Sequence, residues 1–286
     1  MTGPTPGWAD RLCATAPFTA LGLVRPLLSK AVRERARVEP PVTAPSGSPA
    51  VRLVTANALH PNREPEAWAR AVLAVEPDMV IAQEVSDELA AAVVAIGGGR
   101  LPHAFVPADR GKGGCAVWSR LPLLEPRSIL AGYRAVIASV EVGGLPVTVM
   151  GVHTMAPTSA RKGAQWRESF AIVADEVEAA APGPVVCAGD WNATLAHLPL
   201  VELLARTGLR DAHTEAGREG ARTWPSGGGR GFDEGVLGRI VGSLPPLALL
   251  DRVLVSEHLA VGAVRELTAP GSDHRAVVAD LAVVAG

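Results

Sequence analysis

The chain has 286 residues, of which 48% are hydrophobic and 20% are charged, and its net charge is −2. This composition is typical of a globular protein with a large core and excludes a mostly disordered chain. The near-neutral charge argues against stable binding of long duplex nucleic acid through a broad basic face, although a few local arginines could still bind a small anion.

Residues 1–48 differ in composition from the rest of the chain. Residues 16–38 can form a short amphipathic helix with a basic end, and residues 39–50 have the composition of a Pro/Ser linker. We expect an N-terminal extension over 1–48, loosely attached or used to bind a partner or a membrane surface, and one large domain over 49–286. The sequence shows no signal peptide and no transmembrane segment, so we expect a cytoplasmic protein.

Hydrophobic periodicity becomes regular after the linker. It predicts a strand at residues 51–57, a helix at 64–76 and a second strand at 77–84. A second helix is predicted at 86–96, because Ser86 is a residue type suited to cap its first turn. Apolar runs without an intervening helix then favour antiparallel hairpins, and they occupy residues 103–107, 113–119, 127–132, 134–142 and 145–153.

The second half of the chain again combines helices with strands. A helix is predicted over 158–181, followed by a strand at 183–190, a helix at 196–207 and strands at 249–256 and 276–284. Strands in two runs, each accompanied by helices, predict an α+β fold in which two mainly antiparallel sheets pack together with helices outside. The first of these helices has one apolar face, formed by Trp166, Phe170, Val173 and Val177.

Polar side chains occur where the predicted strands end or begin. Each one alone is explained as a turn residue, a cap or a structural histidine. Strand ends on one side of a sheet converge, however, and several carboxylates gathered there would repel one another unless a cation lay among them. The residues concerned are Asn57, Glu84, His153, Asp190 and Asn192 after strands, and Asp251, Asp273 and His274 before them.

The residue types in this set indicate which cation would bind. Carboxylate and amide oxygens with only two histidines suit Mg²⁺, or Mn²⁺, better than Zn²⁺. The three cysteines lie at wide spacings and form neither a zinc motif nor a disulfide framework. Mg²⁺ held by one or two carboxylates keeps open positions that phosphate oxygens fill. The pattern therefore predicts phosphoester chemistry.

Six short motifs in order, TAN (55–57), IAQE (81–84), GVH (151–153), GDWNAT (189–194), LLDRVLVS (249–256) and GSDHRAV (271–277), resemble the endonuclease/exonuclease/phosphatase superfamily. The resemblance covers approximately residues 50–286. It implies a four-layer αββα sandwich with the active site at one end of the two sheets. It also implies Mg²⁺-dependent hydrolysis of a phosphoester bond by in-line displacement, with fixed donors stabilising the transition state.

The same resemblance assigns roles to the metal side and to the base. Glu84 would be the principal Mg²⁺ ligand, with Asn57 close by, and Asp273 would help to hold the metal or the base. His274 would be the general base that activates water, and Asp251 would orient its imidazole through a hydrogen bond.

The remaining roles implied by the resemblance concern the phosphoryl group. Asp190 would orient the attacking water or assist the leaving oxygen, Asn192 would bind a phosphoryl oxygen, and His153 would donate to the developing negative charge. After Asp251 this chain has Arg252, where many members have His or Tyr. An Asp-Arg pair also resembles tyrosyl-DNA phosphodiesterases, so local substrate contacts would differ without loss of activity.

The substrate is predicted less directly than the chemistry. Arg167 and Trp224 are our candidates for substrate binding, and the glycine-rich residues 225–235 could form a lid over the site, with a plain surface loop as the alternative. The chain has one Tyr and four Phe, which gives no obvious platform for stacking single-stranded bases. Other cations that could bind phosphate, or simply lie in solvent, are Arg110, Lys112, Arg161 and Lys162.

We therefore expect a small-molecule or lipid-linked phosphoester as the substrate. Two alternatives within the enzyme class are a nuclease that acts on DNA or RNA ends or nicks, and a dedicated enzyme of secondary metabolism that uses the same metal site. The alternative of a different class is a binding protein that has lost catalysis. None of the residues whose loss would mark such a protein is missing, namely Glu84, Asp190 and His274.

Overall fold

The computed structural model of the protein describes residues 46–226 and 244–284. The predicted helix within 16–38 lies outside these residues, as does nearly all of the predicted lid at 225–235. Within the described residues, no helix is long and apolar enough to cross a membrane.

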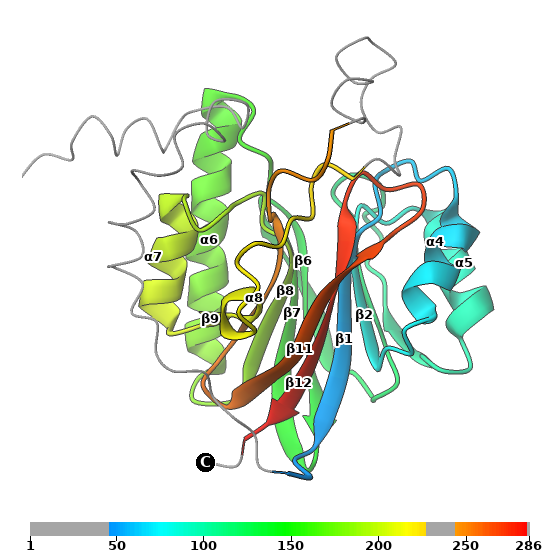
Figure 1. Ribbon diagram of the computed structural model, residues 1–286, viewed down its shortest axis with the longest axis horizontal. Helices are drawn as coiled ribbons and strands as arrows, with labels where there is room; N and C mark the ends of the chain where they lie inside the picture. The colour runs from blue at the N-terminus through cyan, green and yellow to red at the C-terminus, as the bar shows by residue number, and fades with distance from the viewer. Residues whose placement is uncertain (1–45, 227–243, 285–286) are drawn as a thin grey trace, which may run out of the picture.

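The described chain forms four layers, with two six-stranded sheets packed face to face and helices on the outer face of each (Figure 1). Helices α4 (Pro65–Leu73) and α5 (Asp87–Gly97) cover the first sheet. Its strands are β1 (Ala50–Asn57), β2 (Met79–Gln83), β3 (His103–Phe105), β4 (Cys115–Ser119), β11 (Leu259–Thr268) and β12 (Arg275–Val283), in the spatial order β11-β12-β1-β2-β4-β3.

The second sheet is covered by α6 (Ala160–Ala180) and α7 (Leu198–Thr207), and the short helix α8 (Ala212–Glu215) lies at its edge. The predicted four-layer αββα sandwich is therefore confirmed. The strands of this sheet are β5 (Leu124–Ala131), β6 (Tyr133–Val142), β7 (Leu145–His153), β8 (Val185–Asp190), β9 (Arg210–Asp211) and β10 (Asp251–Val255), in the spatial order β5-β6-β7-β8-β10-β9.

Alternation along the strands divides the core into three apolar layers. In β1, Val51 and Leu53 pack between the two sheets, whereas Val54 and Ala56 face α4 and α5. This follows from the strand repeat, because successive side chains point to opposite faces of the sheet. Burial of one large apolar side chain stabilises the fold by about 1.5–3 kcal/mol. The predicted apolar face of α6 forms part of the third layer.

Local signals set the ends of the helices, and the first of them, the cap at Ser86, is as predicted. Ser86 caps α5, because its side chain accepts a hydrogen bond from the amide of Leu89. Ser159 caps α6 in the same way, through the amide of Lys162. Helix α7 stops at Gly208, whose left-handed conformation (φ 69°) suits glycine.

One parallel strand pair in each sheet determines where polar residues meet. β1 pairs with β2 in parallel, with Asn57 opposite Gln83, so that Glu84 follows at the same edge. β7 pairs with β8 in parallel, with His153 opposite Asp190. All other strand pairs within the described residues are antiparallel. Since parallel strands end at the same edge of a sheet, residues distant in sequence are brought together at one end of each sheet.

Strand β11 is the one long strand that the periodicity does not predict. Its pairing with β12 shifts register between Val261 and Val264, at a β-bulge. The extra residue breaks the two-residue alternation by which strands are recognised, and Gly262 lies within this irregular stretch.

Candidate active site

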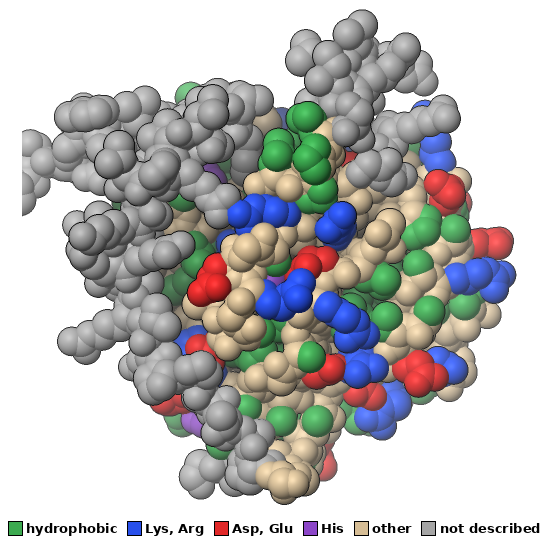
Figure 2. Space-filling view, in the orientation of Figure 1, with side chains coloured by type: hydrophobic (Ala, Val, Ile, Leu, Met, Phe, Trp, Pro, Cys, Tyr) green, Lys and Arg blue, Asp and Glu red, His purple; other side chains and the backbone are tan. Residues whose placement is uncertain are grey.

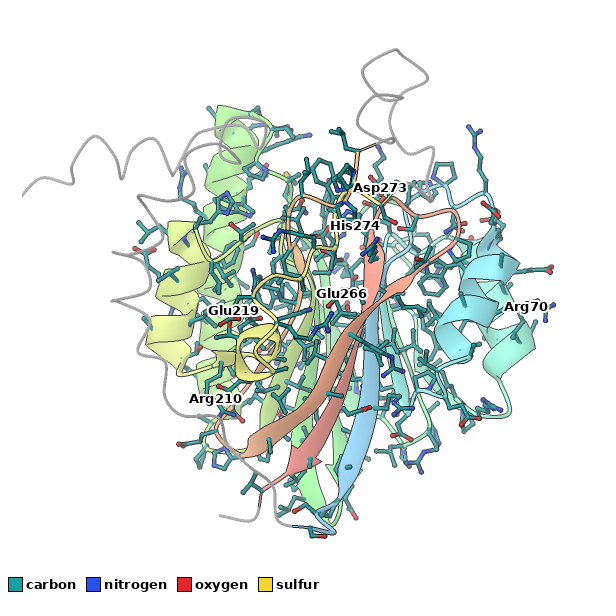
Figure 3. The ribbon with its side chains drawn as sticks, in the orientation of Figure 1. Arg70, Arg210, Glu219, Glu266, Asp273 and His274 are labelled. Carbon is teal, nitrogen blue, oxygen red and sulfur yellow. The ribbon has the colours of Figure 1, made fainter. Side chains whose placement is uncertain are left out.

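The site lies at the end of the sandwich where both parallel pairs finish. Antiparallel pairing of β8 with β10 places Asp251 directly opposite Asp190. From the other sheet, His274 immediately precedes β12 and reaches Asp251 across the gap between the sheets. Figure 3 shows His274 and Asp273 at this end of β12.

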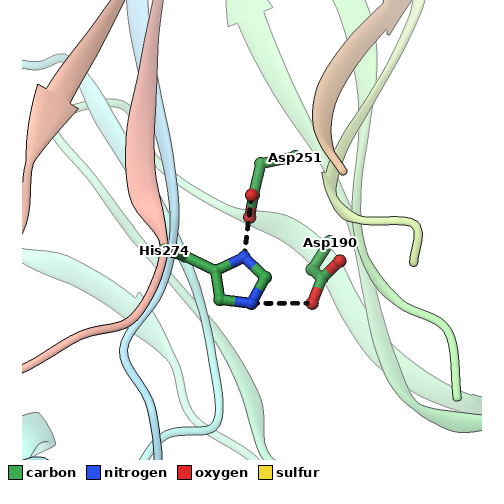
Figure 4. Close-up of side chains that lie close together, drawn as sticks. All are labelled: Asp190, Asp251 and His274. Atoms are coloured by element: carbon green, nitrogen blue, oxygen red, sulfur yellow. Dashed lines mark hydrogen bonds and ion pairs between the residues drawn. The ribbon is translucent and has the colours of Figure 1, made fainter. Parts of the chain in front are cut away.

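His274 and Asp251 form a buried dyad. Nδ1 of His274 lies 2.8 Å from Oδ2 of Asp251 (Figure 4). Burial alone would lower the pKa of His274, but the negative charges of Asp251 and Asp190 outweigh it and hold the pKa well above its usual value. The dyad therefore fixes both the orientation of the imidazole and its charge.

A single carboxylate oxygen, Oδ2 of Asp190, is the centre of the site. It accepts hydrogen bonds from Nδ2 of Asn57 at 3.0 Å and from Nδ2 of Asn192 at 3.3 Å. It also lies 3.7 Å from Nε2 of His153 and 3.8 Å from Nε2 of His274. Burial raises the pKa of Asp190, and the positive charge of His274 opposes this rise. Side chains from both sheets thus converge on one atom.

His153 is a neutral donor in this arrangement. Burial lowers its pKa to about 4, although the charge of Asp190 acts in the opposite direction. Nδ1 of His153 is buried and has no hydrogen-bond partner among the described residues, while Nε2 faces Asp190. The tautomer with the proton on Nε2 is therefore favoured, since a buried N–H without an acceptor would be costly.

Glu84 is joined to Asp190 through Asn57, whose Nδ2 donates to both carboxylates. Its carboxylate accepts from Nδ2 of Asn57 at 3.3 Å and from the backbone amide of His60 at 2.9 Å. Burial raises the pKa of Glu84, and the bond from His60 opposes that rise. Three non-glycine residues here have left-handed backbone conformations, which cost free energy and concentrate at functional sites, namely Leu59 (φ 61°), Glu84 (φ 58°) and Asn192 (φ 45°).

The donor set fits a hard divalent cation. Asp190, Asp251 and His274 offer ligand atoms within 4.8 Å of one another, a grouping that could hold a metal ion. Because His274 already bonds Asp251 through Nδ1, however, this group is better described as a dyad beside a carboxylate. Glu84 and Asp273 add two carboxylates, and no ion pair among the described residues places an arginine or lysine on any of the four. An oxygen-rich cluster of this kind suits Mg²⁺ or Mn²⁺.

The predicted substrate-binding residues differ in their proximity to the cluster. Nε1 of Trp224 donates to Oδ2 of Asp273 at 3.3 Å, so both residues lie at the rim of the site. Arg167 is exposed on α6, with its guanidinium beside Gly163. Arg110 forms an ion pair with Asp87 at 2.9 Å.

Two hydroxyl groups support the site through bonds to its backbone. Oγ of Ser272 donates to the carbonyl of Asn57 at 2.6 Å and accepts from the amide of His274 at 3.0 Å, which joins β1 to the residue before β12. Oγ1 of Thr223 accepts from the amide of Asp251 at 3.2 Å. The position of Ser272 inside a motif is the only signal that could have identified it, because serine is common in turns.

Arg252 supports the site from the outer face of the second sheet. Its guanidinium donates to Oδ2 of Asp211 at 2.8 Å and to the carbonyl of Leu249 at 3.3 Å, and both charged side chains are buried. Alternation in β10 turns Arg252 away from the gap between the sheets, into which Asp251 points. The departure from the family pattern at this position is thus a buried ion pair beside the dyad.

Comparison with known proteins agrees with this geometry. A family model described as the Endonuclease/Exonuclease/phosphatase family matches residues 54–274. No curated protein gives a significant match to the sequence.

Solved structures share the fold at low sequence identity. An endonuclease/exonuclease/phosphatase from Beutenbergia cavernae DSM 12333 is 22% identical, with a TM-score of 0.60 over 82% of this chain and 72% of that chain. D. rerio TDP2 complexed with single strand DNA product is 17% identical, with a TM-score of 0.65 over 81% and 98% of the two chains. Sphingomyelinase C from Streptomyces griseocarneus is 19% identical, with a TM-score of 0.56 over 82% and 99%.

Proposed function

Because this chain belongs to the endonuclease/exonuclease/phosphatase family, we propose that it is a hydrolase of phosphoester bonds that depends on a divalent metal ion, Mg²⁺ or Mn²⁺. The observation that carries the proposal is the convergence of side chains from both sheets on Oδ2 of Asp190, next to a buried His–Asp dyad. A protein that only binds a ligand has no need of this costly arrangement of buried carboxylates.

The dyad supplies the general base. Nε2 of His274 accepts a proton from the attacking water, while the N–H at Nδ1 stays bonded to Asp251. Asp251 stabilises the imidazolium that forms, as a buried carboxylate does in other His–Asp pairs. The carboxylate of Asp190, 3.8 Å from Nε2 of His274, orients the water between them.

Neutral donors face the phosphoryl group. His153 is uncharged above a pH of about 4, and in the favoured tautomer it donates from Nε2. Asn192 is held by the bond from its Nδ2 to the carbonyl of Thr154 at 2.8 Å. The second N–H of this amide, which donates to Oδ2 of Asp190 at 3.3 Å, would turn to a phosphoryl oxygen when substrate binds. Donors fixed in this way stabilise charge that develops in the transition state without reorganising.

Glu84 is the principal ligand for the metal, with Asn57 beside it and Asp273 at the rim. A bound divalent cation supplies positive charge that neutralises phosphoryl oxygens and favours the unprotonated imidazole of His274. The oxygen ligands and the absence of an arginine or lysine on these carboxylates within the described chain support this assignment.

The substrate we favour is a small-molecule or lipid-linked phosphoester. On the face in Figure 2, Lys and Arg side chains lie beside Asp and Glu side chains. Ion pairs engage several of the exposed arginines of the described chain, such as Arg218 with Glu266 at 2.6 Å and Arg206 with Glu178 at 2.6 Å. A surface of paired charges gives weak support for binding long nucleic acid, which needs unpaired cations. Because the fold is shared with both TDP2 and a sphingomyelinase, the comparison does not favour a nucleic acid over a lipid-linked phosphoester, or the reverse.

The test compares hydrolysis of bis(p-nitrophenyl) phosphate and p-nitrophenyl phosphate with Mg²⁺, Mn²⁺ or EDTA. We expect turnover that EDTA abolishes and that His274→Ala lowers by about 10²- to 10⁴-fold, the usual contribution of a general base. His103→Ala is the matched control, because His103 lies on edge strand β3 opposite Ser119, at the far end of β4 from the site.

Two results would contradict the proposal. One is hydrolysis that survives EDTA, and the other is a folded His274→Ala protein with the turnover of wild type. If wild type is active, sphingomyelin, small phosphodiesters and 5′-blocked or nicked DNA are then compared by kcat/KM, and a preference for DNA would replace our substrate class with the nuclease alternative.

A further inference from the structure

Tyr133, the only tyrosine of the chain, lies against the site although no motif includes it. It is the first residue of β6, and its ring packs on the imidazole of His153 with 4.6 Å between ring centroids and an interplanar angle of 38°. The residue is only partly buried. An aromatic ring in this position forms a wall of the site next to a predicted catalytic donor.

The hydroxyl of Tyr133 is not fully buried. No hydrogen bond between described residues includes this hydroxyl, and it does not belong to the buried unpartnered atoms. The charges that act on it come from Glu84 of one sheet and Asp190 of the other, which add to the effect of burial in raising its pKa. The phenol is thus a protonated donor at neutral pH, on a ring that packs on His153.

The segment around Tyr133 is fixed from two directions. The turn before it passes so close to α6 that a Cβ on Gly132 (φ 82°) would lie 2.4 Å from Oγ of Ser169. After it, the amide of Arg134 donates to the carbonyl of Gly113 at 3.1 Å, and the guanidinium of Arg134 pairs with Asp109. A donor held in this way binds a ligand without much loss of conformational entropy.

We propose that the hydroxyl of Tyr133 donates a hydrogen bond to a non-bridging phosphoryl oxygen of the substrate, so that Tyr133 is a substrate-contacting residue. This inference rests on the proposed function and deepens it. Tyr133 and His153 together present two neutral donors to one side of the phosphoryl group. A charged donor would form ion pairs with the surrounding carboxylates and so compete with a metal cation for these carboxylates. Neutral donors bind phosphate oxygens without this competition.

Two variants separate the hydroxyl from the ring. Tyr133→Phe keeps the contact with His153 and deletes the donor, whereas Tyr133→Leu deletes both. We expect Tyr133→Phe to lower kcat/KM for bis(p-nitrophenyl) phosphate by about tenfold or more with an unchanged Tm, which is the usual effect of losing a hydrogen bond to a charged group. If Tyr133→Phe matches wild type and only Tyr133→Leu is impaired, the ring merely packs on His153 and the inference is wrong.

A binding measurement decides the inference even if wild type hydrolyses neither ester. Protein labelled with ¹³C at the tyrosine Cζ gives one tyrosine signal, because the chain has one tyrosine, and Tyr133→Phe removes it. Titration with inorganic phosphate in the presence of Mg²⁺ should move this signal, and KCl at equal ionic strength should not. A signal that stays in place throughout the phosphate titration overturns the inference. Loss of the proposed function would instead be seen as wild-type protein without metal-dependent turnover.

Discussion

At the scale of the residue, the site combines groups that are each unfavourable in a protein interior. Burial raises the pKa of both Glu84 and Asp190, which means that their charged forms are destabilised by the fold. Leu59, Glu84 and Asn192 add backbone strain of about 1–3 kcal/mol each. Packing of the sheets around the site must offset the cost of the buried charges and of the strained backbone. The free energy of unfolding is therefore expected to increase when a buried charge or a strained residue is replaced.

Glu84→Gln tests this balance. In EDTA the variant should have a higher Tm than wild type, because a charge disfavoured by burial has been removed, although the single acceptor oxygen of glutamine can keep only one of the two bonds from Asn57 and His60. Added Mg²⁺ should raise the Tm of wild type by mass action and leave that of the variant unchanged. Glu257→Gln, at an exposed position, is the control. A variant that is less stable in EDTA and still gains stability from Mg²⁺ would show that Glu84 is not the metal ligand.

Sequence reasoning predicted the polar residues of the site better than their support. Strand-end residues could be identified because a carboxylate or amide directly after an apolar run conflicts with burial, as for Asp190 after β8. Ser272, Thr223 and Tyr133 gave no such conflict, since hydroxyl and aromatic side chains suit many environments. Arg167 was predicted from its position on a helix, which does not by itself fix the direction of a long side chain. The roles assigned to the residues remain predictions.

At the scale of the element, the parallel pairs β1–β2 and β7–β8 are what build the site, and they depend on close approach of the chains. A Cβ on Gly189 of β8 would lie 1.8 Å from the carbonyl oxygen of Val152 in β7, too close for any side chain. Helices and most strands could be predicted because their periods of 3.6 and 2 residues are visible in the sequence. Pairing partners and the bulged β11 could not, since they depend on contacts between distant segments.

Gly189→Ala should therefore separate β7 from β8 at the residues that carry His153 and Asp190. We expect a loss of several kcal/mol, beyond the usual range for point substitutions, and little folded protein. The matched control is Gly208→Ala at the end of α7, where φ is 69° but nothing lies within 4 Å of the added Cβ. Only backbone strain, about 1 kcal/mol, is expected there. Comparison of soluble yield and Tm separates the two effects, and equal losses would contradict the explanation by steric contact.

At the scale of the whole molecule, stability depends on histidines that the fold keeps neutral. His197 at the start of α7 is buried, and burial lowers its pKa to about 4. Its Nδ1 accepts a hydrogen bond from the amide of Thr194 at 3.0 Å, which only the unprotonated nitrogen can do. The unfolded chain binds a proton near pH 6.5, so between these values it binds more protons than the folded chain. Acid therefore favours unfolding over this range.

His197→Asn should remove this contribution. Between about pH 6.5 and about pH 4, the free energy of unfolding of wild type should fall by about 3 kcal/mol more than that of the variant. The difference accumulates at ~1.4 kcal/mol per pH unit. The measurement is the free energy of unfolding from urea titrations of both proteins at pH 6.5 and pH 4. The variant is expected to be less stable at pH 6.5, since it loses packing against Trp166. The same pH dependence in both proteins would contradict a neutral His197.

The pairing of β1 with β12 runs the length of the sandwich. At one end, Ala50 lies opposite Ala282, and the amide of Val283 bonds the carbonyl of Pro49 (Figure 1). At the other end, roughly 20 Å away at 3.3 Å per residue, the same two strands lead to Asn57 and His274. A force that pulls residues 49 and 283 apart would open this antiparallel ladder one bond at a time, as in a zipper, instead of shearing all its bonds together. Mechanical tension between those two points would thus reach Asn57 and His274 only after the bonds of the ladder had opened one after another.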